Sequence, residues 1–335
     1  MTDHALPCAT AAAEGLPTGS STRPPVLIIA GPTASGKSRL AMDVAAAFTG
    51  TIINADSMQV YRELRVLTAR PSTADEARVP HRLYGVLSAR ERCSAGRWAA
   101  MAAAEIEAAL GARRLPIVVG GTGHYLRALT LGLAPIPGVP VEVHAAAMAL
   151  HADLGGEAFR EALAAADPET AARLAAGDTQ RLVRAYEVML ATGKPLSDWQ
   201  RTPPQRPVAG ARFATLVLDP PRDDLIRVID ARLEQMLAAE AIAEVRNLLD
   251  LGLDPSLPAM KAVGVKELAA YVRGNCGMEQ AAAAAMVATR RFAKRQRTWI
   301  RHQIAADFTV TEQYSERFRP KIFTFIRQFL LTAAS

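Results

Sequence analysis

The sequence predicts an α/β fold in which helices flank a parallel β-sheet, with a helical insertion domain and a helical C-terminal region added to it. Two observations carry this prediction. Short apolar runs alternate with helical patterns, and a glycine-rich segment, Gly31–Ser38, joins the first apolar run to the first helical stretch. Because strands that alternate with helices form parallel sheets, we expect a sheet like that of the P-loop NTPases.

The segment Gly31–Ser38 has the pattern G-x-x-x-x-G-K-S in the setting that this pattern requires. The apolar run Val26–Ala30 precedes it, and the helical stretch Arg39–Ala45 follows it. In such a loop the backbone N–H groups turn toward phosphate oxygens, and the helix N-terminus adds partial positive charge. Lys37 brings a full charge, and the Ser38 hydroxyl can ligate Mg²⁺. The pattern predicts a phosphate site without saying which phosphates it holds.

The chain's excess positive charge is local. Half of the 335 residues are hydrophobic, and the formal net charge is +6. Six basic residues and no acidic residue lie between Met286 and Arg301, so this segment alone equals the excess. A localised basic face indicates a polyanionic partner. No apolar stretch approaches the roughly 20 residues of a membrane helix.

The N-terminal residues and the cysteines suggest a cytoplasmic protein. Residues 1–24 are small, polar and proline-containing, so we expect a disordered tail rather than a secretory signal. Cys8, Cys93 and Cys276 are scattered along the chain. Neither their number nor their spacing indicates a set of disulfides or a metal site. We therefore expect a reducing, cytoplasmic location.

An acidic residue follows the second predicted strand, Thr51–Ala55. Ligands of open α/β sheets sit at the carboxyl ends of the strands, so Asp56 should face the phosphate crevice. There it could hold Mg²⁺ or serve as a base. The alternative is that Asp56 or Ser57 caps the N-terminus of a helix.

The next part of the core ends in a second glycine turn. We expect a polar loop at residues 62–83 and a third strand at Tyr84–Leu87. A helix should follow at Ser94–Leu110, with Trp98 in the core. The apolar run Pro116–Val119 is a further strand and leads into Gly120-Gly121-Thr122-Gly123. A Thr hydroxyl and backbone amides at that turn can reach a phosphate from the side opposite the P-loop.

Two proline-rich breaks enclose a helical block, so we predict a helical insertion at residues 138–208. The strand Phe213–Asp219 then returns to the sheet. Arg222–Leu251 predicts a long amphipathic helix or a pair of helices. The last predicted helix of the core, Ala281–Gln303, carries a basic stripe whose expected role is contact with phosphate. Its members are Arg290, Lys294, Arg297 and Arg301.

These motifs together resemble those of the bacterial tRNA dimethylallyltransferases, which modify an adenosine beside the anticodon. The matching stretches occur in family order over about residues 25–302. They are GPTASGKS (31–38), DSMQVY (56–61), TARPS (68–72), PHR (80–82), VVGGTG.Y (118–125), QRLVRAYEV (180–188), KAVGVKE (261–267) and TRRFAKRQRTW (289–299).

The resemblance implies a reaction and a division of the chain. The dimethylallyl group of dimethylallyl diphosphate moves to N6 of the adenosine 3′ of the anticodon, and diphosphate leaves. A catalytic core would comprise residues 25–137 and 209–310, with the insertion binding tRNA and residues 311–335 forming a helical extension. The enzyme would be a monomer that uses Mg²⁺.

The resemblance also implies the site residues. Asp56 is the base, and Thr122 and Arg232 complete the catalytic set, with Ser38 as the metal ligand. The diphosphate-binding residues are Gly31, Pro32, Thr33, Ala34, Ser35, Gly36, Lys37 and Ser38. The tRNA-binding residues are Asp56, Ser57, Met58, Gln59, His144, Gln180, Arg181, Leu182, Val183, Arg184, Lys261, Ala262, Val263, Gly264, Val265 and Lys266.

The chain departs from the family pattern at three places. Arg70 stands where the family often has lysine, which keeps the charge but changes the donor geometry. A family arginine that contacts tRNA aligns with His144. Another family arginine aligns with Val228, and Arg227 lies beside it.

Three other functions share part of this pattern. A small-molecule P-loop kinase would need neither the basic C-terminal helix nor the insertion, and would carry a lid with arginines for ATP. An adenylate isopentenyltransferase would not need the long insertion. An RNA-binding module with a degenerate nucleotide site would not need Lys37, Ser38, Asp56 and Thr122 together.

Overall fold

The computed structural model describes residues 23–332, which form two compact units. Unit 1 combines the described residues up to Thr130 with those from Pro207 onward, and unit 2 is Leu131–Arg206. Of the predicted tail at residues 1–24, residues 1–22 with Cys8 lie outside the described residues. Within residues 23–332, no helix is both long enough and apolar enough to cross a membrane.

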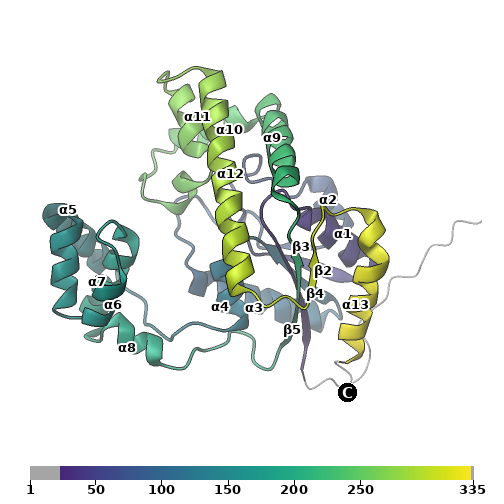
Figure 1. The fold of residues 1–335 in the computed structure, drawn as a ribbon, viewed down its shortest axis with the longest axis horizontal. Helices are drawn as coiled ribbons and strands as arrows, with labels where there is room; N and C mark the ends of the chain where they lie inside the picture. The colour runs from purple at the N-terminus through teal and green to yellow at the C-terminus, as the bar shows by residue number, and fades with distance from the viewer. Residues whose placement is uncertain (1–22, 333–335) are drawn as a thin grey trace, which may run out of the picture. The chain divides into compact units, whose positions relative to one another are not determined.

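A parallel sheet forms the centre of unit 1 (Figure 1). Across the described residues it has six strands in the order β3-β2-β4-β1-β5-β6. Their bounds are β1 Pro25–Ala30, β2 Gly50–Asn54, β3 His81–Arg82, β4 Leu115–Gly120, β5 Arg212–Leu218 and β6 Phe308–Val310. Every residue of β1, β2 and β4 is buried. Burial on both faces explains why these strands are continuous apolar runs.

Helices connect and cover these strands, which confirms the predicted fold class. The helices of unit 1 are α1 (Lys37–Ala47), α2 (Thr73–Arg78), α3 (Ala95–Gly111), α4 (Gly123–Thr130), α9 (Arg222–Ala238), α10 (Ala241–Asp250), α11 (Val265–Val272), α12 (Met278–Gln303) and α13 (Arg319–Leu331). Two short 3₁₀ helices, η1 (Pro258–Lys261) and η2 (Glu316–Phe318), complete the unit.

The C-terminal helix α13 is part of the core of unit 1. Its residues Ile322 and Ile326 are fully buried and belong to the same apolar cluster as Leu40 and Phe48. The rings of Phe48 and Phe323 meet edge to face, with centroids 5.2 Å apart. Fully burying an aliphatic side chain contributes roughly 1.5–3 kcal/mol, so α13 and the short strand β6 before it stabilise the sheet.

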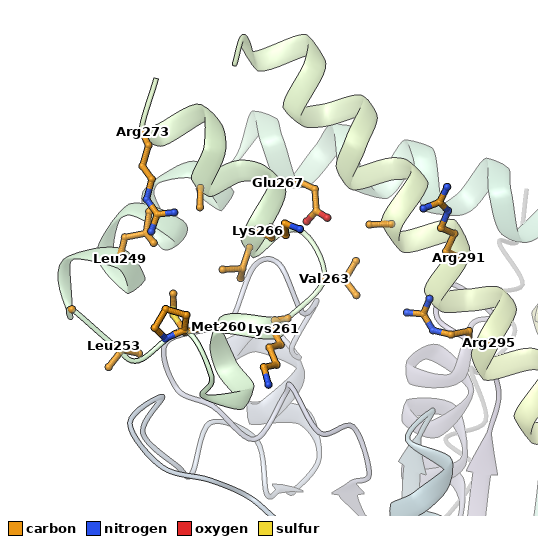
Figure 2. Close-up of a pocket in the computed structure, with 16 residues that line it drawn as sticks. Leu249, Leu253, Met260, Lys261, Val263, Lys266, Glu267, Arg273, Arg291 and Arg295 are labelled. Atoms are coloured by element: carbon orange, nitrogen blue, oxygen red, sulfur yellow. The ribbon is translucent and has the colours of Figure 1, made fainter. Parts of the chain in front are cut away.

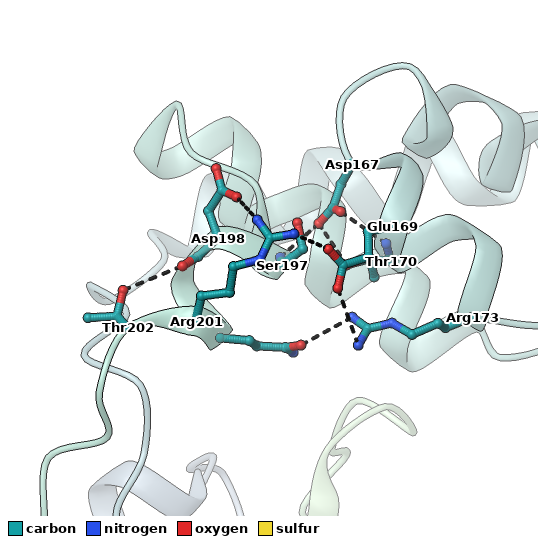
Figure 3. Close-up of polar contacts among 9 residues, drawn as sticks. Asp167, Glu169, Thr170, Arg173, Ser197, Asp198, Arg201 and Thr202 are labelled. Carbon is teal, nitrogen blue, oxygen red and sulfur yellow. Dashed lines mark hydrogen bonds and ion pairs between the residues drawn. The ribbon is translucent and has the colours of Figure 1, made fainter.

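Unit 2 is helical and has an apolar core of its own. Its helices are α5 (Val141–Ala164), α6 (Pro168–Arg173), α7 (Thr179–Thr192) and α8 (Leu196–Arg201). Phe159, Leu163 and Leu182 lie in its core. The buried Asp167 accepts hydrogen bonds from the backbone N–H of Thr170 and of Ser197, both at 3.0 Å. One carboxylate therefore caps α6 and joins it to α8 (Figure 3).

The predicted third strand at Tyr84–Leu87 is wrong. The strand at this edge is β3, which pairs with Ile52 and Ile53 of β2 through His81 and Arg82. Leu83 and Gly85 have φ angles of 64° and 60° and turn the chain, so only Leu87 pairs further, with Tyr61. The apolar run is therefore a turn.

The predicted polar loop at residues 62–83 contains a short helix, α2. Ser72 and Asp75 form a capping box at its N-terminus, in which each side chain accepts from the other residue's backbone N–H. This pattern is readable in the sequence, but the helix is only six residues long and buries none of them.

Candidate functional site

Three adjacent strands bring the predicted catalytic segments together. In the order β2-β4-β1, all parallel, the carboxyl ends meet at one edge of the sheet. The turn with Asp56 follows β2, the turn with Thr122 follows β4, and the P-loop follows β1. The strand positions that the sequence predicts for these segments therefore converge on one site.

The P-loop has the backbone geometry of an anion site. Ala34 and Gly36 have φ angles of 67° and 91°, and α1 begins directly after Gly36. Ser35 is fully buried, and within residues 23–332 its Oγ has no hydrogen-bond partner. A buried hydroxyl without a partner costs free energy, so Ser35 fits a loop that receives polar atoms from a ligand.

Lys37 and Arg232 concentrate positive charge beside this loop. Burial lowers the pKa of Lys37 to about 8, the negative charge of Asp56 opposes that shift, and the positive charge of Arg232 adds to it. Lys37 Nζ donates to the carbonyl of Pro32 at 2.6 Å. Burial also lowers the pKa of Arg232. Within the described part of the chain, Arg232 has no ion pair that neutralises it. The three charges of Lys37, Arg232 and Asp56 therefore interact at one site.

Asp56 is a half-buried carboxylate held in a defined orientation. Its Oδ1 accepts from the backbone N–H of Met58 at 2.9 Å. Burial raises the pKa of Asp56, while hydrogen bonds from Met58 and Gln59 and the charge of Lys37 act in the opposite direction. A base whose pKa is raised takes a proton more readily, provided that it remains ionised. Neither Asp56 nor Ser57 caps a helix, which rules out the alternative considered for these residues.

Thr122 is bonded to the turn that contains Asp56. Its Oγ1 accepts from the backbone N–H of Ser57 at 3.0 Å and donates to Ser57 Oγ at 3.3 Å. The backbone N–H of Thr122 donates to the carbonyl of Ala55 at 3.3 Å. These bonds keep the two turns in register with each other, so Thr122 and Asp56 are positioned as a unit.

Two residues that bond the turns of this candidate site were absent from the sequence prediction. Asn54, fully buried at the end of β2, bonds the backbone of Asp56 and of Leu83. Gln296 of α12 accepts from the Thr33 N–H at 2.8 Å and donates to the Gly121 carbonyl at 3.1 Å. A polar residue at the end of an apolar strand was the available signal for Asn54. For Gln296 there was none, because its partners are distant in the sequence.

The remaining residues of the Asp56 turn are half-buried. Gln59 uses its amide Nε2 to donate to the carbonyl of Thr68 at 2.7 Å. Ser57 is engaged with Thr122, and Met58 bonds Asp56 through its backbone. Arg70, the departure from the family lysine, donates to the carbonyls of Tyr61 and Arg62. It therefore supports the loop after this turn.

The predicted segment from Lys261 to Lys266 lines a pocket in unit 1 (Figure 2). The pocket has a volume of about 690 Å³. Its charged lining consists of five cations and one acid, which are Lys261, Lys266, Arg273, Arg291, Arg295 and Glu267. A pocket with this balance favours an anionic ligand. The side chains of Ala262 and Val265 are buried and Gly264 has none, so the prediction of tRNA contact is not retained for their side chains.

The basic stripe predicted on α12 does not face outward as a whole. Arg290 pairs with Asp230 of α9, and Arg297 and Arg301 both pair with Asp219 after β5. Each of these three cations therefore has a carboxylate partner within the protein, and their contact with phosphate stays a prediction. Helical spacing identifies a common face, but it cannot show that acids from distant segments cover that face.

A neighbouring face of α12 also carries exposed cations. Arg291, Lys294 and Arg295 line a second pocket of about 460 Å³ with Thr298 and Trp299. Arg291 and Arg295 also line the first pocket, so the two pockets share these two arginines. Of the predicted stripe, Lys294 belongs to this face. The face combines cations with an aromatic ring, as nucleic-acid sites often do.

In unit 2 the predicted contact residues divide into exposed and buried ones. Leu182 and Val183 are buried in its core, so the prediction of RNA contact is not retained for their side chains. Gln180, Arg181 and Arg184 at the start of α7 are exposed.

The exposed arginines of unit 2 differ in their partners. The side chain of Arg181 is 75% exposed and pairs with Asp178 at 3.3 Å. The Arg184 side chain is 44% exposed and pairs with the buried Glu187 at 2.7 Å, which also holds His144 at 2.5 Å. His144 and Arg184 therefore share one carboxylate.

Comparison with known families gives one match over most of the chain. The family model described as IPP transferase matches residues 59–303. The tRNA dimethylallyltransferase of Rhodospirillum centenum is 60% identical over 282 residues, which is 84% of this chain and 90% of that protein. The enzyme of the same name from Paramagnetospirillum magneticum is 51% identical over 314 residues, covering 94% of this chain and 99% of the relative.

Solved structures give the same likeness. A tRNA isopentenylpyrophosphate transferase from Bacillus halodurans matches with a TM-score of 0.65 and 28% identity, over 93% of this chain and 98% of that one. One from Staphylococcus epidermidis matches with a TM-score of 0.64 and 29% identity, over 91% and 99%. A eukaryotic dimethylallyltransferase whose structures show it acting on tRNA has the same fold, with a TM-score of 0.75, 24% identity and coverage of 91% and 80%.

Proposed function

The chain belongs to the IPP transferase family, and from that premise we propose how its residues transfer a dimethylallyl group to tRNA. It is a prenyltransferase of the tRNA dimethylallyltransferase type. The prenyl donor is dimethylallyl diphosphate, and the acceptor is N6 of the adenosine 3′ of the anticodon. The observation that supports this assignment is that Lys37 after β1, Asp56 after β2 and Arg232 of α9 lie close enough together for the charges of Asp56 and Arg232 to act on Lys37.

The P-loop holds the diphosphate of the donor. Backbone N–H groups of Gly31–Ser38 and the N-terminus of α1 bind its oxygens, and the buried Ser35 hydroxyl is available as a further contact. Negative charge grows on the diphosphate as the allylic C–O bond breaks. Lys37 and Arg232 stabilise that charge, and they do so best in a site with little water.

A Mg²⁺ ion fits this site if Ser38 is its protein ligand. Among the described residues, no cluster of three or more His, Cys, Asp or Glu side chains could hold a metal. Mg²⁺ commonly takes its other ligands from substrate phosphates and water, which suits a site with one hydroxyl ligand. When bound, it would neutralise part of the charge on the leaving diphosphate.

Asp56 prepares the adenine amino group, whose lone pair is delocalised into the ring. Its carboxylate accepts a hydrogen bond from N6–H, and the N6 lone pair forms the new C–N bond. The electrons of the broken C–O bond leave with the diphosphate, and the N6 proton passes to Asp56. Thr122 holds the turn of Asp56 in place through Ser57.

Exposed cations of both units bind the anticodon stem-loop. In unit 1 these are Lys261 and Lys266 and the α12 face of Arg291, Lys294 and Arg295. Unit 2 contributes Gln180, Arg181 and Arg184. The target base must leave its stack, which costs only a few kcal/mol for a loop base. Residues Asp56–Gln59 then border the extruded base.

The same proposal covers the organisation of the chain. Residues 25–137 and 209–310 act as the catalytic core, residues 138–208 as the tRNA-binding insertion, and residues 311–335 as a C-terminal extension. The protein acts as a monomer in the cytoplasm.

One incubation separates this function from its alternatives. The protein is mixed with labelled dimethylallyl diphosphate and Mg²⁺, and with either tRNA or AMP. Label that appears in tRNA alone, with release of diphosphate, supports the proposal. Label in AMP would favour an adenylate isopentenyltransferase. A parallel reaction with ATP and no prenyl donor tests for a kinase, and phosphate transfer there without alkylated RNA would overturn the proposal.

A further inference from the structure

Two glutamines bond the two peptide units of the P-loop that flank the Thr33–Ala34 peptide. Gln296 Oε1 accepts from the backbone N–H of Thr33 at 2.8 Å. Gln313 Nε2 donates to the backbone carbonyl of Ala34 at 3.0 Å. The first glutamine lies on α12, and the second lies in the segment between β6 and η2. Elements from two places in the chain therefore support the same pair of residues.

The backbone conformation of Ala34 is unfavourable unless the surrounding residues stabilise it. Ala34 has a φ of 67°, in the left-handed region that residues with a Cβ rarely occupy. It is also buried, at 4% exposure. Such conformations persist where the surrounding structure holds them, and they occur often in ligand-binding segments. Hydrogen bonds on both sides of the Thr33–Ala34 peptide supply that restraint.

Gln296 also connects the P-loop to the turn of Thr122. It is 6% exposed, and its Nε2 donates to the carbonyl of Gly121 at 3.1 Å. A Cβ at Gly121 would lie 2.3 Å from that nitrogen, so only glycine leaves room for the amide. The orientation of the amide is determined, because Thr33 supplies a donor and Gly121 an acceptor.

Gln313 is anchored through its neighbours to the helix that follows the P-loop. Tyr314 donates from its hydroxyl to Asp43 Oδ2 of α1 at 2.6 Å, and Arg319 pairs with Asp43 Oδ1 at 2.7 Å. A Cβ at Gly36 would lie 2.9 Å from Tyr314 Cβ, so the segment that contains Tyr314 packs directly against the P-loop. The segment that contains Gln313 and Tyr314 therefore contacts the P-loop at Ala34 and Gly36 and bonds α1, the helix that follows the loop.

We propose that Gln296 and Gln313 are positioning residues, which hold Thr33 and Ala34 in the form that binds the donor's diphosphate. The inference rests on the proposed role of the P-loop as a diphosphate site. Neither side chain needs to touch the reacting atoms. Their effect is to keep the loop's N–H groups directed toward the anion before it arrives, which spares binding the cost of ordering the loop.

The experiment compares Gln296→Met and Gln313→Met with the wild type, because methionine keeps the volume and removes the hydrogen bonds. Inorganic diphosphate is titrated into each protein in the presence of Mg²⁺. We expect affinity for diphosphate to fall about tenfold in each variant, because each variant loses one hydrogen bond to the P-loop itself. KM for the prenyl donor should rise in parallel, while affinity for tRNA should stay within about twofold of the wild type.

Hydrogen exchange of the P-loop amides provides a second measurement. Its result would not change if the two glutamines only stabilised the fold as a whole. The amides of Gly31 and of residues 33–36 should exchange faster in both variants without diphosphate, and saturating diphosphate should restore much of their protection. The control is Gln280→Met, because Gln280 is exposed on α12 and makes no hydrogen bond through its side chain to a described residue. It should match the wild type in both measurements.

The outcomes distinguish a failure of the positioning role of the glutamines from a failure of the proposed diphosphate site. If the wild type binds diphosphate and Lys37→Ala does not, the site is where we propose it. Unchanged diphosphate affinity and loop exchange in both glutamine variants would then overturn the positioning role alone. If the wild type itself binds no diphosphate, the proposed role of the P-loop fails, and the inference fails with it.

Discussion

Asn54 and Asp56 bond each other in both directions. Asn54 Nδ2 donates to the backbone carbonyl of Asp56 at 3.0 Å, and the backbone N–H of Asp56 donates to Asn54 Oδ1 at 2.8 Å. The backbone carbonyl of Asn54 accepts from the indole of the buried Trp98 at 2.8 Å. The orientation of the proposed base is thus determined by a residue at the end of β2 that is itself fixed in the core.

Replacing Asp56 by asparagine should stop prenyl transfer and spare diphosphate binding. The amide has nearly the same shape but cannot take the N6 proton, so the single-turnover rate should fall at least about 10²-fold. Rapid-quench measurement of labelled tRNA gives that rate, and calorimetry gives the affinity for diphosphate. A variant that transfers the prenyl group at the wild-type rate would exclude Asp56 as the base.

Replacing Asn54 by alanine should affect both stability and rate. The change leaves the Asp56 N–H and the Leu83 carbonyl without their partner, which costs roughly 1–3 kcal/mol of unfolding free energy for each buried group left unpaired. Urea unfolding measures this loss, with the exposed Asn247→Ala as control. The transfer rate should also fall in the folded fraction, because Asp56 loses its orientation. A variant destabilised but fully active would show that Asn54 serves the fold alone.

Diphosphate binding should weaken as the pH rises through about 8. Burial lowers the pKa of Lys37 to about 8, so in the free enzyme its ammonium is charged below that pH and neutral above it. The anion binds the charged form, and affinity is therefore lost on the alkaline side. Arginine stays charged throughout this range, so Lys37→Arg should titrate only with the ligand's own protons. Identical pH profiles for the two proteins would contradict the assignment.

The two faces of α12 should respond differently to mutation. Arg291→Ala and Arg295→Ala should each weaken tRNA binding and reduce the slope of log affinity against log salt by roughly 0.7–0.9, the value for one phosphate contact. Arg290 is matched in helix and charge, but it is paired with Asp230. Arg290→Ala should lower stability and leave the salt slope unchanged. A smaller slope for Arg290→Ala than for Arg295→Ala would reverse our assignment of the faces.

Local patterns predicted the central strands, the P-loop and the helices around them. Val26–Ala30 and Pro116–Val119 are buried on both faces, which gives an unmistakable apolar run, and Gly31–Ser38 carries its pattern within eight residues. The edges of the sheet lacked such signals. Strands β3 and β6 are two and three residues long, and their pairing depends on neighbours far along the chain.

The site shows the same division. Lys37, Asp56 and Thr122 follow strands or glycine turns that locate them in advance. Gln296 and Gln313 act through partners more than 260 residues away, since each bonds the P-loop. Likewise the acids that neutralise Arg290 and Arg297 come from other elements. Residue type and spacing describe a helix face, whereas the fold decides what that face meets.

Helix α12 presents Arg291 and Arg295 on an open surface and Gln296, the very next residue, to the P-loop and the turn of Thr122. Each residue of an α-helix advances the facing direction by about 100°. Inserting one residue between Arg295 and Gln296 would therefore keep the helix but rotate either the arginines or the glutamine away from its partners. The number of residues in this helix is therefore more strictly constrained than their identities. Insertions and deletions are better tolerated in the loops elsewhere in unit 1.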